Sequence, residues 1–458
     1  MKKYLLLLPL FAVAHSASAQ LSPAITSWLQ NTTETGSYYV EGNSMPIDNG
    51  ILYNCQKVEY SSDHAFIHTN GIPAYPTGPF LDGNPSFAES QDAIFKIPLF
   101  PQQNMGTPTP TNPGNIGIFI NGVALFDYRD GVAWSAQDNA MCGGPPGLFS
   151  PCPGGPMAAQ DWNRDAVPAE REGFDCSKAH PAMGNYHHHQ NPSAFKLDLQ
   201  VVSDICNLYD ADGLYAIDDT QHSPLIGFAY DGFPIYGAYG YKNVDGTGGI
   251  VRIKSGYQLK DITTRPNGPD VDLVINAGGG TQTLFLGYFR EDYEWLAHPG
   301  EEDYLDVHNG RFCVTPEYPE GTYAYFATVD ENWNSAYPYA VGPTFYGVAQ
   351  NRQVNNVDQP TTVYTDLTSI SQVEFHQMNI TVFPNPTADL IAVQINDLAK
   401  TDFQVDLIGL NGQVVDVTVI EKGSTIAYFD TQVVYGGTYL VKISSGNFYT
   451  TQQVVIVK

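Results

Sequence analysis

The chain has 458 residues, enough for two or three domains, and a formal net charge of −27 from 48 acidic and 21 basic side chains. A surface this acidic repels phosphate backbones, which predicts that nucleic acid is not a partner. The many tyrosines (29), phenylalanines (23), glycines (43) and prolines (32) favour pleated, turn-rich structure, so we expect a mainly β fold.

The N-terminus has the parts of a secretory signal peptide. Two lysines and a short apolar run occupy residues 2–14, and the small-x-small motif Ala17-Ser18-Ala19 follows. We therefore predict a signal peptide over residues 1–19. No later segment has 18 consecutive apolar residues, so no transmembrane segment is predicted.

The next part of the chain alternates short apolar runs with turn residues. We expect residues 20–114 to form a β-rich N-terminal part of the exported passenger, followed by a domain over residues 115–348. That domain opens with a predicted hairpin over residues 116–126, because Asn121-Gly122 is a strong tight-turn signal between two apolar runs. Residues 138–185 are rich in glycine and proline and predict a long surface excursion.

The six cysteines indicate disulfide bonds, because an even number is typical of exported proteins. Cys142 and Cys152 bracket a short proline-containing loop that could close on itself, but the sequence leaves the pairing open. No Cys-x-x-Cys motif supports a thiolate metal site. The cysteines are Cys55, Cys142, Cys152, Cys176, Cys206 and Cys313.

A run of three histidines, His187 to His189, is the most informative feature of the chain, which has only eleven histidines. In an extended segment, His187 and His189 share one face, roughly 6.6 Å apart along the strand, while His188 points to the other face. Histidine is the commonest metal ligand and also suits proton transfer near neutral pH. The pattern predicts a metal-binding pair or an acid–base pair.

A metal site needs at least one more ligand. The candidates are His180, His222, His298 and His308, with Asp231 as a carboxylate alternative. We prefer His222, because it opens the next unusual motif along the chain. Neutral imidazoles suit copper or zinc.

Two further segments contain candidate polar residues. Asp231-Gly232 and Pro234 predict a turn that leads into a strand, and the side chains of Asp231 and Tyr236 are candidates to face a cleft. Seven acidic residues lie between positions 291 and 306. A solvated loop is the simplest interpretation of this stretch, and a calcium site is the sharper alternative.

The C-terminal part changes character. Residues 349–377 are polar and lack apolar periodicity, which predicts a linker. Seven short strands at regular spacing then predict a small immunoglobulin-like β-sandwich over residues 378–458.

This tail resembles the C-terminal sorting domain of type IX secretion substrates. The matching motifs are Val382-Phe-Pro-Asn-Pro-Thr387, Leu410-Asn-Gly-Gln-Val-Val415, Gly436-Gly-Thr-Tyr-Leu-Val441 and Val454-Val-Ile-Val-Lys458. The resemblance implies passage through the periplasm, recognition by the type IX secretion machinery, and a final location outside the cell or on its outer surface.

The region of about residues 115–348 resembles the YHYH-domain family. The resemblance rests on Tyr186-His187-His188-His189, where His188 replaces the family's second tyrosine, and on the segments 222–227, 231–237 and 308–319. It makes Tyr186 and His308 further candidate site residues. The family is defined by sequence and implies no established general activity.

Three hypotheses for function follow. The first is a secreted or surface protein that binds a transition metal through His187, His189 and His222. The second is an extracellular hydrolase that uses His187 or His189 as a general base with Asp231 or an acid of residues 291–306. The third is an adhesion or glycan-binding module that uses exposed aromatic side chains of residues 236–241. The ligand itself is left open.

Overall fold

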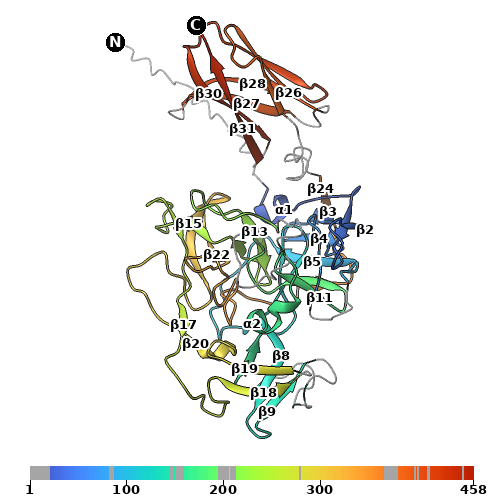
Figure 1. Cartoon of the computed structure of the whole chain (residues 1–458), viewed down its shortest axis with the longest axis vertical. Coiled ribbons are helices and arrows are strands. Elements are labelled where there is room, and N and C mark those ends of the chain that lie inside the picture. Colours follow the sequence, from blue (N-terminus) through green and yellow to red (C-terminus); the bar gives the residue numbers. More distant parts are fainter. Residues whose placement is uncertain are drawn as a thin grey trace, which may run out of the picture.

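The computed structural model is built mainly of β-strands, as the composition predicts (Figure 1). It describes residues 21–365 and 380–458, apart from 82–86, 145–148, 150–151, 153–158, 194–205, 207–212, 278–279, 397–398, 400–401, 410–412 and 446–447. The predicted signal peptide lies outside the described residues. No helix in the described part of the chain is long and apolar enough to cross a membrane.

The N-terminal part forms a five-stranded antiparallel sheet in the order β23-β5-β4-β3-β24. A short helix, α1, and a separate hairpin, β1–β2, precede it. The bounds are α1 Pro23–Thr26, β1 Thr35–Tyr38, β2 Ile47–Leu52, β3 Cys55–Tyr60, β4 His64–Thr69, β5 Ala93–Pro98, β23 Gln353–Val354 and β24 Thr362–Tyr364.

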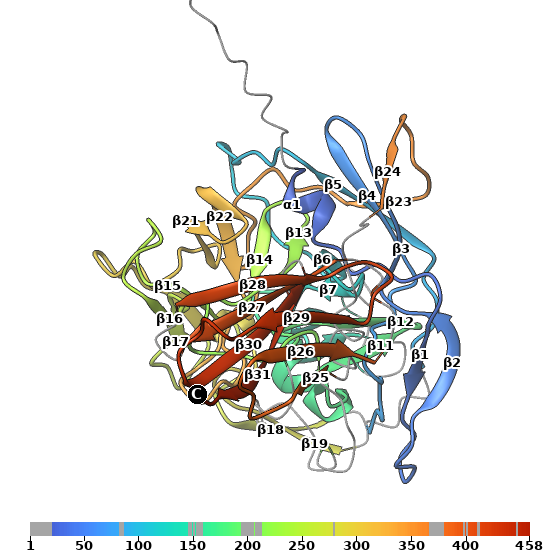
Figure 2. The ribbon, with the colours of Figure 1, turned by 90° about the horizontal axis from the view of Figure 1, so that it is seen from above.

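The two edge strands of this sheet correct the predicted linker. β23 pairs with β5 and β24 pairs with β3, so residues 353–364 belong to the passenger (Figure 2). An edge strand presents unpaired N–H and C=O groups, and these short polar strands satisfy them. Arg352 adds a buried anchor, because its Nε donates to the carbonyl of Tyr230 at 2.5 Å. The remainder of the predicted linker, from residue 366, lies outside the described residues.

The centre of the passenger is an eight-stranded sheet in the order β11-β12-β7-β6-β13-β14-β22-β21. Its strands, in that order, are Ala179–Ala182, Asn185–His188, Ala124–Phe126, Asn115–Phe119, Leu225–Ala229, Pro234–Tyr236, Tyr318–Phe326 and Gly310–Thr315. The hairpin predicted at Asn121-Gly122 is confirmed as β6–β7. Gly122 is required there, because its φ is +78° and an added Cβ would lie 2.1 Å from Thr69 Oγ1.

The strand order shows that this sheet contains the same four-strand unit twice. Each unit has a first hairpin (β6–β7 or β13–β14), an excursion, and a second hairpin (β11–β12 or β21–β22). In each unit the second strands of the two hairpins pair in parallel, β12 with β7 and β22 with β14. The units meet where β6 pairs antiparallel with β13, and the equivalent residues Ile118 and Phe228 are partners. The halves are thus related by a local twofold axis.

The excursions differ between the halves and hold most of the irregular structure. The first contains β8 Arg129–Ser135, β9 Ala140–Gly143, β10 Asn163–Asp165, the helix α2 Ala166–Glu170 and the 3-10 turn η2 Arg171–Gly173. The second contains β15 Tyr239–Tyr241, β16 Ile250–Arg252, β17 Tyr257–Leu259, β18 Leu273–Ala277, β19 Gly280–Leu284, η5 Arg290–Asp292 and β20 Tyr293–Trp295.

Four of the six cysteines form disulfide bonds. Cys142 bonds Cys152, closing the short loop between them, and Cys176 bonds Cys206. The expectation that all six cysteines are disulfide-bonded is wrong for Cys55 and Cys313, which are free and buried. Cys55 begins β3 in the five-stranded sheet, whereas Cys313 lies in β21 at the edge of the eight-stranded sheet.

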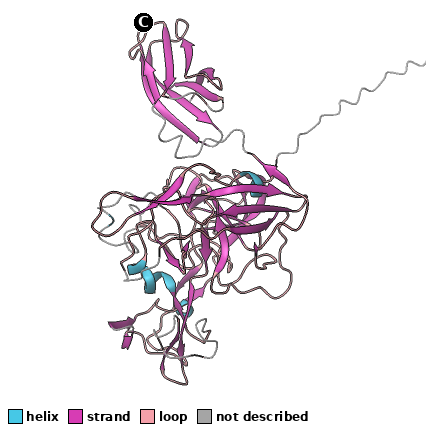
Figure 3. Ribbon diagram, turned by 90° about the vertical axis from the view of Figure 1, so that its right-hand side faces the viewer, coloured by secondary structure: helices cyan, strands magenta, loops and turns pink. Residues whose placement is uncertain are grey.

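The C-terminal part is a β-sandwich with its own core, drawn as a separate group of strands in Figure 3. One sheet has the order β25-β26-β29 and the other β28-β27-β30-β31, which agrees with the predicted immunoglobulin-like architecture. The strands are β25 Ile380–Phe383, β26 Leu390–Ile395, β27 Phe403–Gly409, β28 Val414–Ile420, β29 Ile426–Asp430, β30 Gly437–Ser445 and β31 Phe448–Ile456.

Candidate metal centre

The alternation predicted for the histidine run is present at β12. The Nε2 atoms of His187 and His189 face each other at 3.1 Å, and both side chains are buried, with 1% and 4% of their surface exposed. His188 points to the other side, where its Nε2 lies 2.9 Å from the hydroxyl of Tyr75. The extended backbone alone produces this division of the three rings.

Backbone carbonyls fix the orientation of both facing rings. His187 Nδ1 donates to the carbonyl of Asn185 at 2.8 Å, and His189 Nδ1 donates to that of Asp127 at 2.7 Å. Because a carbonyl oxygen only accepts, each Nδ1 carries a hydrogen and each neutral ring has its lone pair on Nε2. Burial, together with the neighbouring imidazoles of His180 and His189, lowers the pKa of His187 well below its usual range.

A third histidine completes the cluster. His180 lies in β11, and the antiparallel register places it directly opposite His187. One ligand nitrogen from each of His180, His187 and His189 lies within 4.8 Å of the other two. These three side chains are called the histidine triad below.

His222, the preferred third ligand from the sequence, is not part of the triad. Its Nδ1 bonds to the carbonyl of Ser223 at 2.7 Å, and its ring packs against Tyr236 and Tyr241, with ring centroids 5.1 and 4.9 Å away. The reason is topological. His222 precedes the first hairpin of the second half, whereas the triad is built from the second hairpin of the first half.

Glu170 adds a carboxylate that sequence reasoning missed. Its Oε2 lies 3.3 Å from Nε2 of His180 and 3.5 Å from Nε2 of His189. Burial by itself raises the pKa of Glu170, but hydrogen bonds and charge from His180 and His189 outweigh it and hold the pKa well below its usual range. The carboxylate therefore adds negative charge beside the ring nitrogens.

Glu170 reaches the triad because of where α2 begins. Asp165 is the N-cap of this helix, and its carboxylate accepts the N–H of Val167 at 2.9 Å. The five-residue helix then ends at Glu170. In the sequence, the capping Asp165 is the local signal that a helix starts here. It does not indicate that Glu170, at the end of the helix, lies next to the histidines.

Two phenylalanines enclose the triad. Phe126 stacks on His187, with ring centroids 3.8 Å apart, and Phe174 meets the edge of His180 at 5.0 Å. The side chain of Glu170 is 24% exposed and that of His180 is 11% exposed. Solvent therefore approaches the cluster from the Glu170 side, while His187 and His189 are covered.

The second half of the sheet shows which residues of this region are framework. Tyr186 corresponds to Tyr323 in the second half. His188 pairs with Leu125, and Tyr325 pairs with Ile235 at the equivalent position of the other half, so the residues two positions earlier, Tyr186 and Tyr323, are equivalent as well. The Tyr186 hydroxyl donates to Asp175 at 2.8 Å, and the Tyr323 hydroxyl donates to Asp306 at 2.9 Å.

The turns that hold these two aspartates are also equivalent. Asp175 accepts the N–H groups of Ser177 and Ala179, as Asp306 accepts those of His308 and Gly310. The residues before Ala179 and Gly310, Lys178 and Asn309, both have a φ of +64°. Tyr186 therefore has a framework role that the second half repeats.

The triad, in contrast, has no counterpart. The residues equivalent to His187 and His189 are Ala324 and Phe326, and Arg311 stands opposite Ala324 as His180 stands opposite His187. The Arg311 guanidinium lies over the Phe326 ring at 5.3 Å. The repeated fold thus forms without histidine at these positions, so their presence in the first half requires another explanation.

The other candidate residues have structural partners in the second half. Asp231 Oδ2 accepts the Tyr325 hydroxyl at 2.5 Å and the N–H of Gly347 at 2.8 Å. His308 Nδ1 lies 2.8 Å from the hydroxyl of Thr344. The Tyr236 side chain is fully buried, and its hydroxyl donates to Glu317 at 2.8 Å.

The acidic stretch of residues 291–306 does not converge on one point. Asp292 pairs with Arg265, both side chains being wholly buried, and Asp303 pairs with Lys254 at 2.8 Å. Glu291 accepts the backbone N–H of Asn163 at 2.6 Å. Within the described ranges, the histidine triad is the group of three or more side chains placed to hold a metal ion.

These positions also bear on the two alternative functions. A general base must contact its substrate, but the burial of His187 and His189 leaves a substrate no direct access to their Nε2 atoms. Asp231 bonds to Tyr325 and Gly347, not to either histidine. The expected aromatic surface at residues 236–241 is also incorrect at Tyr236, which is buried in the core.

Comparison with known protein families identifies the C-terminal sandwich. Residues 381–458 match the model of the secretion system C-terminal sorting domain. This identifies a type IX secretion substrate, located outside the cell or on its outer surface. No curated protein matches the chain.

The passenger matches a second family model. The match to the YHYH protein family covers residues 94–338, more than half of the chain. It starts within the five-stranded sheet, earlier than the boundary expected at residue 115, and it includes both halves of the eight-stranded sheet and the whole triad. The chain belongs to the YHYH protein family.

Proposed function

We propose that this exported protein binds one transition metal ion through His180, His187 and His189, with Glu170 as the fourth ligand. The observation that carries the proposal is the 3.1 Å approach of two Nε2 atoms whose rings both donate from Nδ1 to carbonyls. In two neutral rings these lone pairs face each other and repel, and either a proton on one Nε2 or a metal ion between them removes the repulsion. A metal ion removes the repulsion without changing either Nδ1 hydrogen bond.

The distances around the cluster support a four-coordinate ion. Metal–nitrogen and metal–oxygen bonds of about 2.0–2.1 Å in a tetrahedron separate neighbouring ligand atoms by roughly 3.3–3.4 Å. The Nε2–Nε2 distance of 3.1 Å and the Glu170 distances of 3.3 and 3.5 Å lie close to this value. The widest ligand separation, up to 4.8 Å, reaches the tetrahedral value when side chains shift inward by roughly 1.4 Å in total on binding.

The ligand set suits zinc and copper. Three imidazoles with one carboxylate are common zinc ligands, and borderline nitrogen ligands also favour copper in the general affinity order. Neutral ligands next to one carboxylate leave a net charge of +1 on the divalent site. A buried site bounded by Phe126 and Phe174 agrees better with tight retention of an ion than with rapid exchange.

The test is elemental analysis of the full chain purified as secreted. We expect close to one zinc or copper ion per chain, lost in the double variant His187→Ala/His189→Ala. The matched control is His222→Gln, which changes the histidine that the sequence favoured and should leave the metal content unchanged. Circular dichroism establishes that each variant is folded.

Two results would overturn the proposal. One is a metal-free native chain that also takes up neither ion in a calorimetric titration. The other is equal loss of metal from the folded His222→Gln variant. The spectrum of the copper-loaded chain then tests the ligand number, because paramagnetic resonance couplings report how many nitrogens bind the ion.

A further inference from the structure

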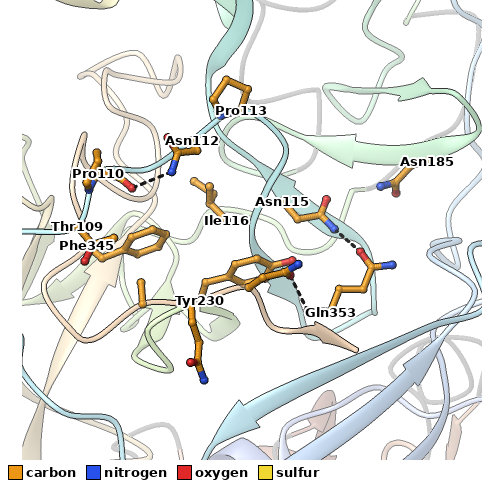
Figure 4. Close-up of a pocket in the computed structure, with 13 residues that line it drawn as sticks. Thr109, Pro110, Asn112, Pro113, Asn115, Ile116, Asn185, Tyr230, Phe345 and Gln353 are labelled. Atoms are coloured by element: carbon orange, nitrogen blue, oxygen red, sulfur yellow. Dashed lines mark hydrogen bonds between the residues drawn. The ribbon is translucent and has the colours of Figure 1, made fainter. Parts of the chain in front are cut away.

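A pocket of about 500 Å³ lies outside the histidine triad, between the segments 109–116 and 345–353 (Figure 4). The two segments are joined by their backbones, since the N–H of Phe345 donates to the carbonyl of Thr109 at 2.9 Å. Asp231 fixes the second segment from behind by accepting the N–H of Gly347. The walls are therefore preformed, and the volume falls within the roughly 300–1,000 Å³ typical of small-molecule sites.

The lining of this pocket is uncharged and rich in carboxamides. In a chain with a net charge of −27, none of its lining side chains is acidic or basic. Tyr230 and Phe345 contribute aromatic rings on either side of Ile116 (Figure 4). The carboxamides are Asn112, Asn115, Asn185, Gln350, Asn351 and Gln353.

Polar side chains along one wall of this pocket are linked to one another. The Tyr230 hydroxyl hydrogen-bonds to Asn115, and Tyr230 is only 6% exposed. The Asn115 Nδ2 in turn lies 3.3 Å from Oε1 of Gln353. Burial raises the pKa of Tyr230, and the hydrogen bond to Asn115 only partly offsets this, so the phenol stays protonated. This linked, uncharged set of side chains holds the wall of the pocket in one arrangement.

We propose that this pocket binds a neutral saccharide unit of an extracellular glycan. Carboxamides both donate and accept, which matches hydroxyl groups that do the same. Aromatic rings supply apolar surface for the C–H face of a sugar ring. Uronate, sulfate or phosphate groups would meet no lining cation and an acidic protein, and a cationic ligand would meet no lining carboxylate.

Asn185 lies at the boundary between this pocket and the triad, and it allows the two sites to be tested separately. Its side chain lines the pocket, whereas its carbonyl accepts the hydrogen of His187 Nδ1. The substitution Asn185→Ala removes the side chain from the pocket and keeps the backbone carbonyl that accepts from His187. The saccharide proposal does not depend on a metal in the triad, because no triad residue lines the pocket.

The experiment measures binding of soluble trisaccharides to the full chain by saturation-transfer NMR and calorimetry. Cellotriose, maltotriose and triacetylchitotriose are the neutral probes, and trigalacturonate is the charged comparison. We expect at least one neutral probe to bind, and trigalacturonate to bind at least about tenfold more weakly. Asn185→Ala and Asn115→Leu should each weaken the neutral probe by about tenfold, the usual effect of losing one hydrogen-bonding group.

Gln350→Ala separates binding from folding. The variant removes an exposed carboxamide that lines the pocket, so the melting temperature should not fall, while saccharide binding weakens about tenfold. The opposite control is Tyr215→Phe, which removes a buried hydroxyl that donates to Asn191 at 2.8 Å. That variant should melt at a lower temperature and bind the saccharide as the native chain does.

Three outcomes would overturn the proposal. They are the absence of binding of every neutral probe at millimolar concentration, binding that the pocket variants leave unchanged, and equally strong binding of trigalacturonate. A neutral peptide, tetraglycine amide, is included because backbone amides have similar chemistry. If it binds with the expected variant pattern and the saccharides do not, the pocket is a peptide site and the saccharide assignment is wrong.

Discussion

The tyrosine–aspartate pair that occurs once in each half of the central sheet gives a stringent test of the framework assignment. Tyr186→Phe removes a 2.8 Å hydrogen bond to Asp175, and both residues are at most 1% exposed. Tyr323→Phe removes the equivalent bond to Asp306, which is only partly buried. The chain thus supplies its own matched comparison, in which the same bond is lost in a dry and in a wetter environment.

The expected magnitudes follow from the surroundings of each carboxylate. A hydrogen bond to a charged group contributes about 1.5–3 kcal/mol, and water replaces part of this where it has access. We expect Tyr186→Phe to lower the free energy of unfolding by about 2 kcal/mol at pH 7.5 and Tyr323→Phe by about 1 kcal/mol. Burial raises the pKa of Asp175 to about 6, so at pH 5 this acceptor is neutral and the Tyr186→Phe loss should shrink to about 1 kcal/mol.

The assay can isolate the passenger from the tail. All five tryptophans precede residue 334 and none lies in the sandwich, so tryptophan fluorescence during urea unfolding reports the passenger. Both variants should retain the metal content of the native chain. Equal losses for the two variants at pH 7.5, or loss of metal from folded Tyr186→Phe, would refute the framework assignment.

Three further predictions concern Glu170, Asp165 and the two free cysteines. Glu170→Gln should weaken zinc or copper binding by about 10–100-fold in a chelator competition with folding intact, and unchanged affinity would remove Glu170 from the ligand set. Burial raises the pKa of Asp165 to about 8, so the native chain must take up a proton to fold above about pH 4, and its stability falls as the pH rises towards 8. Asparagine at position 165 does not titrate, so the free energy of unfolding of Asp165→Asn lacks this fall with pH. Urea unfolding should therefore show the stability of the variant relative to the native chain increasing across this range, by at most about 1.4 kcal/mol per pH unit. A difference that stays constant with pH would contradict the buried acid. A thiol reagent should label Cys55 and Cys313 only after denaturation, giving two thiols per chain, whereas rapid labelling of the native chain would contradict their burial.

Some features of this protein follow from the sequence because they are local. Alternation along an extended segment is enough to place His187 and His189 on one face, since successive side chains of a strand point in opposite directions. The turn at Asn121-Gly122 depends on the glycine, whose φ is +78°, a backbone conformation that glycine adopts without strain. The sandwich of the tail could be predicted because each of its short strands carries its own apolar pattern and turn residues.

Other features were decided only by contacts between distant segments. His180 joins the triad through the register of β11 on β12, and Glu170 through the position of a helix whose start is fixed by Asp165. Neither contact has a sequence spacing that identifies it, and the same lack of a local signal made His222 look like the better ligand. The division of residues 349–377 was also decided in this way, because short polar strands find partners only at the edges of a sheet that is already formed.

The twofold repeat is the clearest case. Its halves share a strand order, a hydrogen-bonded aspartate and a positive φ at equivalent turns, but few identical side chains. Backbone pairing tolerates such differences, because hydrogen bonds between strands do not depend on side-chain identity. Alternation along the chain therefore places His187 and His189 on one face, whereas the pairing of distant strands decides which side chains lie beside them and which hold the sheet together.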